Sequence, residues 1–275
     1  MRQQPATKKK GLVVHLIGAG CLGSWLSKYL DGEKSIHQIV VYDPDLVETK
    51  NLVNSYYKES NVGQPKVTSL LCRLKKVVGI QERYPTEYVS VKKGDIVIDC
   101  SDSPSSFPKV HFKAAILGDS LIIVDKKTLR KNIGESNLLG AFLKFSSSSC
   151  TKKNLVKLAA RFVMGLIISK TYTMLTYPIM LSLKPSEADL LASKQIPSDL
   201  FLEKKDTISI RYLGKEKDIS CQDISLPIQR ILSKYFPELC DDKEGEQEEN
   251  GMYFTEILRS KGQTVIHIIP ARMQA

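Results

Sequence analysis

The sequence lacks the patterns that mark zinc sites, export signals and membrane spans. No two of its six cysteines have CxxC spacing, so nothing indicates a structural zinc site. Residues 1–10 are polar and basic without an apolar core, which argues against a secretory signal. Charged residues interrupt the most apolar segment, at 154–183, which argues against a membrane-spanning helix. We therefore expect a cytoplasmic protein with reduced thiols, no zinc and no membrane partner.

Acidic residues are scarce outside one segment. The sequence has 40 Lys+Arg residues against 30 Asp+Glu, a net charge of +10, and seven of the acids lie within residues 238–249. The remainder is therefore strongly basic, which is compatible with phosphate-rich or acidic partners. Because no window interleaves arginine with aromatic residues, we favour a lysine-rich solvated surface, and RNA is the less favoured alternative.

The pattern at residues 11–43 is typical of a nucleotide-binding βαβ unit. An apolar run at 11–17 meets the sequence GAGCLG, a helical stretch follows, and a second apolar run ends on Asp43. Gly18 would permit a tight turn, Gly20 the approach of a phosphate, and Gly23 close packing of helix on strand. Asp43, twenty residues beyond Gly23, would accept hydrogen bonds from a ribose. The alternative is a glycine turn that only packs.

Apolar runs, and the prolines and glycines between them, predict further helices and strands. Pro65 should begin a helix, and the run at 95–99 predicts a buried parallel strand followed by polar residues at its carboxyl end. Other predicted strands lie at 87–91, 121–125 and 138–145, with a helix at 109–117. Residues 154–183 read as a mostly helical segment that Pro178 ends or bends. Its apolar excess favours a homodimer or heterodimer through this region.

Together these elements predict an α/β fold with a doubly wound, mainly parallel, Rossmann-like sheet and a small C-terminal α+β domain. We place the first domain at residues 1–183, a connector at 184–199 and the small domain at 200–275. Within the small domain we predict a strand at 207–213, a helix at 223–236 capped by Asp223, a helix at 254–260 and a strand at 264–269. No residue pattern there indicates chemistry.

Four segments resemble the ThiF/MoeB/HesA family, which includes the adenylation domains of ubiquitin-activating enzymes. They are GAGCLGSWLSKYL at 18–30, VVYDPDLVETKNL at 40–52, VGQPKV at 62–67 and DIVIDCSD at 95–102. The resemblance implies a divergent member with a ThiF-type fold that binds ATP and Mg²⁺. It also implies adenylation of the C-terminal carboxylate of a small ubiquitin-like or sulfur-carrier protein.

Carried over residue by residue, the resemblance gives a set of cofactor-binding positions: Gly18, Gly20, Gly23, Asp43, Asn51, Asn54, Lys66 and Asp102. Lys66 would contact the phosphates, and Asp102 would bind Mg²⁺ with the triphosphate, so these two are the catalytic candidates. Such chemistry needs cations because a carboxylate attacks an anionic phosphate. The alternatives are a surface lysine at 66 and a helix cap at 102.

The sequence also departs from the family. Asn54 and Ser55 stand where the family has an Arg-Gln pair, and a neutral amide cannot supply the arginine's charge. Two accounts follow: a divergent adenylyltransferase that takes cations from Lys126, Lys127 or Arg130, or a catalytically inactive partner or scaffold subunit. A tRNA-modifying relative and an NAD-dependent dehydrogenase remain as further alternatives.

Overall fold

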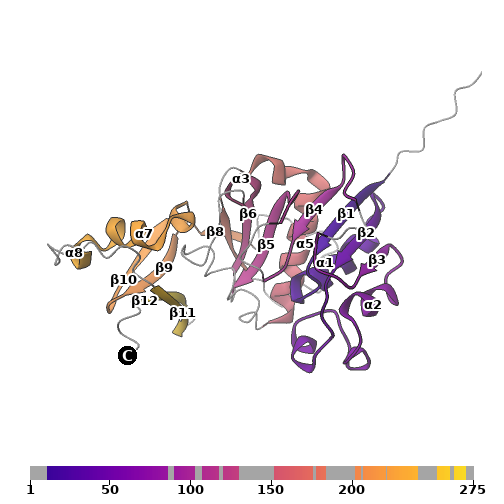
Figure 1. Ribbon diagram of the computed structural model, residues 1–275, viewed down its shortest axis with the longest axis horizontal. Coiled ribbons are helices and arrows are strands. Elements are labelled where there is room, and N and C mark those ends of the chain that lie inside the picture. The colour runs from indigo at the N-terminus through magenta and orange to yellow at the C-terminus, as the bar shows by residue number, and fades with distance from the viewer. Residues whose placement is uncertain are drawn as a thin grey trace, which may run out of the picture.

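The computed structural model describes residues 11–85, 90–102, 107–117, 120–129, 152–175, 178–183, 202–205, 207–220, 222–240, 253–260 and 263–270. Two sheets organise them, one of eight strands and one of four, and Figure 1 shows the smaller sheet in a lobe beside the larger one. None of the described helices combines the length and apolar character that a membrane crossing needs.

The large sheet has the strand order β3-β2-β1-β4-β5-β6-β7-β8. The strands of this sheet are β1 (Leu12–Ile17), β2 (Ile36–Tyr42), β3 (Val77–Ile80), β4 (Ile96–Asp99), β5 (Phe112–Leu117), β6 (Ser120–Asp125), β7 (Ile179–Leu183) and β8 (Leu202–Lys205). Strands β3, β2, β1, β4 and β5 are parallel, and β6 to β8 add antiparallel pairs. The predicted mainly parallel α/β sheet is confirmed. Strand order reverses between β1 and β4, the position where such sheets bind ligands.

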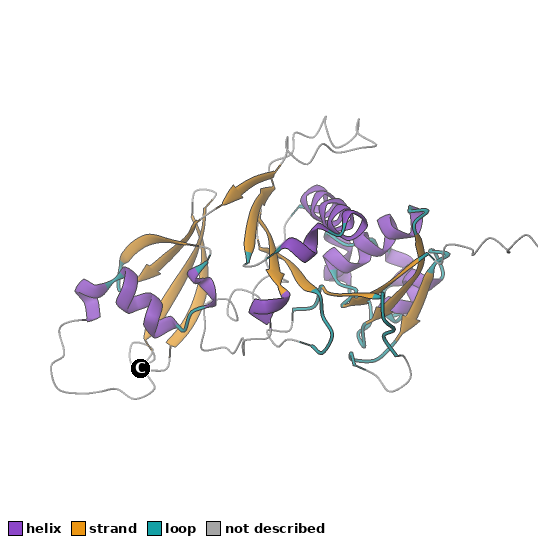
Figure 2. Ribbon diagram, turned by 90° about the horizontal axis from the view of Figure 1, so that it is seen from above, coloured by secondary structure: helices purple, strands orange, loops and turns teal. Residues whose placement is uncertain are grey.

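Helices cover this sheet unequally. The helices α1 (Cys21–Gly32), α2 (Lys66–Leu71) and α5 (Lys153–Ser169) pack on one face, where α1 and α5 lie against each other (Figure 2). The short helix α3 (Lys126–Leu129) packs on the opposite face. Successive strand residues alternate between the faces, so Leu16 contacts the α1 side and Ile17 the other. Burial on both faces explains the continuous apolar runs of β1, β2 and β4.

Two predictions within this domain are wrong. Residues 112–117 form strand β5 and not a helix, and Phe112, Ala114 and Ile116 share one face, as a period of two requires. The segment 154–183 is helical only as far as Ser169. Lys170 then adopts a left-handed conformation (φ 59°) that closes α5, and the 3-10 helix η3 (Thr171–Met174) leads towards β7. Pro178 therefore does not end the helix.

The small sheet contains β9 (Thr207–Tyr212), β10 (Lys215–Ser220), β11 (Tyr253–Ser260) and β12 (Gln263–Pro270) in the order β10-β9-β12-β11. It is accompanied by η4 (Asp223–Ser225), α7 (Ile228–Tyr235) and α8 (Pro237–Cys240). The predicted helix at 254–260 is wrong, because β11 pairs with β12 along its whole length. The predicted helix at 223–236 begins later, at Ile228 with Pro227 as its N-cap, and Asp223 instead forms an ion pair with Lys234.

Some predictions cannot be compared with the structure. The strands expected at 87–91 and 138–145 fall largely or wholly outside the described residues, as do the connector at 184–199 and most of the acidic segment. Strand β8 follows that connector in the sequence and pairs with β7 of the large sheet.

A buried ion pair joins β4 to β5. The Nζ of Lys113 donates to Oδ2 of Asp99 at 2.8 Å and to the carbonyl oxygen of Ser101 at 2.7 Å. Both charged side chains are almost completely inaccessible to water. The other Asp99 oxygen accepts from the backbone N–H of Ser101 at 2.8 Å and from its hydroxyl at 2.7 Å. This network fixes the start of the loop after β4.

Lys113→Met is expected to lower the free energy of unfolding by about 3–5 kcal/mol, because Asp99 would keep a buried charge without its partner. Urea denaturation measures this loss. Lys75→Met, at an exposed lysine, is the matched control and should change stability by no more than about 0.5 kcal/mol. Equal stability of the two variants would show that the pair does not form.

Candidate nucleotide-binding site

The three glycines of the turn after β1 meet different steric demands. Gly18 has a φ of 89°, and a Cβ there would lie 2.9 Å from the Cα of Ser101, so the turn touches the end of β4. A Cβ on Gly23 would overlap the Gly18 carbonyl oxygen. A Cβ on Gly20 would meet nothing within 4 Å. Gly18 and Gly23 are therefore required by the fold, whereas Gly20 leaves open space.

That open space adjoins the N-terminus of α1. Gly20 is the N-cap of α1 and supplies no capping side chain, and the first turn contains no acidic residue. The backbone N–H groups there carry a partial positive charge that favours an anion. A partly buried helix start without a Cβ at Gly20 has the shape and charge that a phosphate group requires.

Asp43 binds directly to this turn. Its carboxylate is buried, with Oδ2 accepting from the N–H of Ala19 at 2.7 Å and Oδ1 from the N–H of Asp45 at 2.9 Å. Burial raises the pKa of Asp43, and the nearby Lys66 and the two N–H donors offset only part of that effect. A carboxylate offers about four acceptor positions, so capacity remains for ribose hydroxyls.

Lys66 reaches the same place from α2, which begins after Pro65 as predicted. Its Nζ lies 2.8 Å from Oδ2 of Asp45 and 3.5 Å from Oδ1 of Asp43, and the residue is only 9% exposed. Burial alone would lower the pKa of Lys66, but the two carboxylates outweigh burial and raise it. The structure thus brings together Asp43 and Lys66, and Lys66 carries a positive charge at neutral pH.

Asp102 lies near the turn but is not joined to it. It is exposed and follows Ser101, whose backbone contacts Gly18. Among the described residues, its side chain forms no hydrogen bond or ion pair, and no group of three His, Cys, Asp or Glu residues could hold a metal ion. Magnesium commonly uses one or two carboxylates together with substrate phosphates, so a single exposed acid fits that role.

The two predicted asparagines have structural contacts. Oδ1 of Asn51 accepts from the N–H of Glu48 at 2.9 Å, which caps the 3-10 helix η1 (Thr49–Val53). The carbonyl of Asn54 accepts from Nε1 of Trp25 at 3.0 Å, which holds the loop against α1. Asp43 and Lys66 make their contacts with Ala19, Asp45 and each other.

The lysines proposed to replace the family arginine lie elsewhere. Asp125, at the end of β6, pairs with Phe112 of β5. The pairings of β5 with β4 and of β4 with β1 then place Asp125 level with Leu16 of β1. Three strand spacings separate them, about 14 Å. Because β6 runs antiparallel, Lys126 and Lys127 lie still further from the glycine turn, so this expectation is wrong. Arg130 lies outside the described residues.

Sequence reasoning missed several residues that build this site. Tyr57 donates its hydroxyl hydrogen to the Ala19 carbonyl at 2.6 Å, and Asp45 holds Lys66. Asp99 and Lys113 support Ser101 beneath the turn. Asp45 was visible as the second acid of the DPD sequence at 43–45, but nothing in the sequence marks Lys113 as a buried lysine.

The N-terminal part of the chain is similar to known proteins. Residues 6–123 match the ThiF family. The adenylyltransferase and sulfurtransferase uba4 of Neosartorya fischeri is 30% identical over 120 residues, covering 43% of this chain and 24% of that protein. The adenylyltransferase and sulfurtransferase UBA4 of Candida albicans is 31% identical over 124 residues, 42% of this chain and 28% of that protein. The match thus spans about a quarter of each relative's length.

Among solved structures, E. coli MccB with ATP is 17% identical, with a TM-score of 0.45 over 70% of this chain and 63% of that chain. The segment matched by the family profile contains β1, α1, β2, α2 and β4, and with them every residue of the candidate site. Over residues 6–123, this chain is therefore similar to the ThiF family.

Proposed function

We propose that this chain binds ATP at the glycine turn and transfers the adenylyl group to a carboxylate, with the C-terminus of a ubiquitin-like or sulfur-carrier protein as acceptor. The observation that carries the proposal is the meeting of Asp43 and Lys66 beside the open face of Gly20. The match of residues 6–123 to the ThiF family supports it, as do relatives named adenylyltransferases.

The reaction assigns a task to each group. An oxygen of the acceptor carboxylate attacks the α-phosphorus, the bond to the bridging oxygen breaks, and pyrophosphate leaves with that oxygen's electron pair. The start of α1 holds phosphate oxygens, Asp43 orients the ribose, and Lys66 reduces the repulsion between the two anions. Bound Mg²⁺ would add positive charge to the triphosphate, with Asp102 as its protein ligand.

Two alternatives make different demands on the site. A dehydrogenase would use the same turn and Asp43 for NAD, but it has no need of a lysine paired with that acid. An inactive partner subunit would keep the fold without turnover, and the neutral Asn54 is the feature that favours this account. Nucleotide preference separates the first alternative from our proposal, and pyrophosphate exchange separates the second.

Calorimetric titration should show binding of ATP with Mg²⁺ in preference to NAD. Asp43→Asn and Lys66→Met should each weaken it by about tenfold or more, or about 1.4 kcal/mol, because each removes a charged contact to the nucleotide. Lys75→Met is the control. ATP-dependent exchange of labelled pyrophosphate, with a carrier protein present, then tests turnover. Tight NAD binding would point to the dehydrogenase, and ATP binding without exchange to the inactive subunit.

The glycines offer a sharper pair of variants. Gly20→Ala adds a methyl group into open space, so it should leave the thermal unfolding midpoint nearly unchanged while weakening ATP binding by about tenfold or more. Gly23→Ala forces its Cβ into the Gly18 carbonyl and should destabilise the fold by about 3 kcal/mol or more. If Gly20→Ala binds ATP as the wild type does, no phosphate approaches this position.

A further inference from the structure

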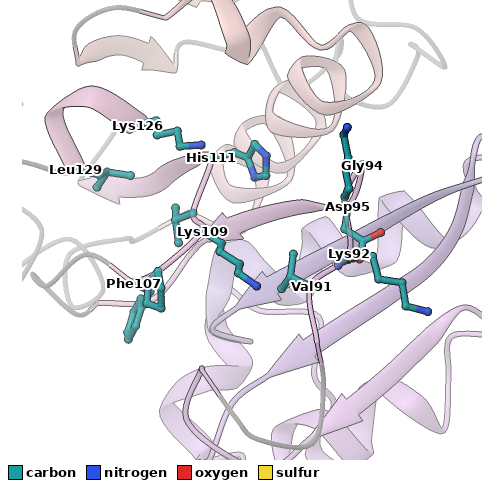
Figure 3. A pocket seen from close by; sticks show the side chains of 12 residues that line it. Val91, Lys92, Gly94, Asp95, Phe107, Lys109, His111, Lys126 and Leu129 are labelled. Carbon is teal, nitrogen blue, oxygen red and sulfur yellow. Dashed lines mark hydrogen bonds between the residues drawn. The ribbon is translucent and has the colours of Figure 1, made fainter.

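The large domain contains a cavity away from the glycine turn. Its volume is about 650 Å³, and its walls come from residues 91–95 before β4, residues 107–111 before β5 and the helix α3 (Figure 3). None of the residues assigned to the nucleotide site lines it. Cavities that bind small molecules commonly measure about 300–1,000 Å³, so this one has the size of a ligand site.

The cavity is strongly basic. Four exposed lysines line it: Lys92, Lys93, Lys109 and Lys126. Within the described part of the chain, none of them forms an ion pair. Among the described lining residues, the one carboxylate belongs to Asp95, whose Oδ2 accepts from the backbone N–H of Lys92 at 2.8 Å and lies 3.2 Å from Nε2 of His15. Positive charge therefore exceeds negative charge in the cavity.

His111 adds a neutral donor to this lining. Its Nδ1 accepts from the backbone N–H of Val97 at 3.0 Å, which places the ring proton on Nε2. Burial, and then the charge of Lys126, lower the pKa of His111, so the neutral tautomer persists at neutral pH. A neutral ring with an N–H beside lysines suits an anionic oxygen acceptor.

The cavity lining also includes apolar side chains and one residue with an uncommon backbone conformation. Val91, Phe107 and Leu129 supply nonpolar surface, and Phe107 packs edge-on against Tyr84. Lys109 has a φ of 63°, a left-handed conformation that is uncommon for a residue with a side chain. Conformations of this kind gather at ligand sites, where the surrounding structure maintains them.

We propose that this cavity binds a phosphorylated small molecule, whose phosphate is held by the lysines and His111 and whose organic part lies on the apolar wall. Lysines bind phosphate as point charges and tolerate different phosphate esters. The cavity volume holds a molecule of nucleotide size. This site is independent of the adenylyl-transfer proposal, because it shares no residue with the glycine turn.

Lysine acetylation footprinting tests the proposal on the full chain, with AMP as the probe and adenosine as its uncharged counterpart. We expect AMP to slow the acetylation of Lys92, Lys93, Lys109 and Lys126 with one common saturation curve, and adenosine to have no such effect. Exposed Lys34 and Lys75 serve as internal references. Lys66 reports separately on the nucleotide turn.

Two variants separate the sites. Lys109→Gln combined with Lys126→Gln should weaken protection of Lys92 and Lys93 by about tenfold in AMP concentration, while protection of Lys66 is unchanged. Gly20→Ala should weaken the protection of Lys66 and leave the protection of Lys92 and Lys93 unchanged. Equal protection of Lys34 and Lys75, absence of protection at millimolar AMP, or undiminished protection in the double variant would overturn the proposal.

Discussion

The buried ion pair between Lys113 and Asp99 determines the arrangement around it. An ammonium group inside the sheet is tolerated only next to a carboxylate and further acceptors, and Asp99 and the Ser101 carbonyl meet that need. The pairing sets Lys113 opposite Asp99 in the register of β5 against β4. It also holds Ser101 where the Gly18 turn packs on it. The glycine turn thus depends on a lysine ninety-five residues away in the sequence.

The directions of β5 and β6 separate the two candidate sites. Strand β5 runs parallel to β4 and pairs antiparallel with β6, so β6 carries its end away from the glycine turn. Lys126 consequently lies in the basic cavity and not beside the phosphates. A crossover helix at 109–117 would have made β6 parallel and delivered Lys126 and Lys127 to the nucleotide edge. The strand conformation of residues 112–117 therefore places Lys126 in the cavity and away from the glycine turn.

This segment also shows where sequence reasoning reaches its limit. The βαβ unit was predictable because its glycines, apolar periods and terminal acid are local and agree with one another. The stretch before β6 was not, because Ala114, Ala115 and Leu117 suit a helix as well as a strand, and tertiary contacts decide between them. The position of Lys66 beside Asp43 was implied by the family resemblance, but its bond to Asp45 depends on side-chain geometry that no pattern encodes. In the small domain, β11 is defined by its partner strand β12.

Under the proposed function, the neutral Asn54 leaves Lys66 to supply more of the positive charge that the phosphates require. Lys66 is already held by Asp45, a residue whose side chain is 62% exposed, and by the buried Asp43. An arriving phosphate competes with these carboxylates for one ammonium group. Asp45 can yield because water solvates its charge once it turns outward, whereas Asp43 is fixed by the Ala19 and Asp45 N–H groups. The exposed Asp45 would therefore keep Lys66 paired before the nucleotide arrives, and the buried Asp43 would keep Lys66 in place afterwards. Under the proposed function, nucleotide binding and the release of Asp45 would thereby be linked through a single charge.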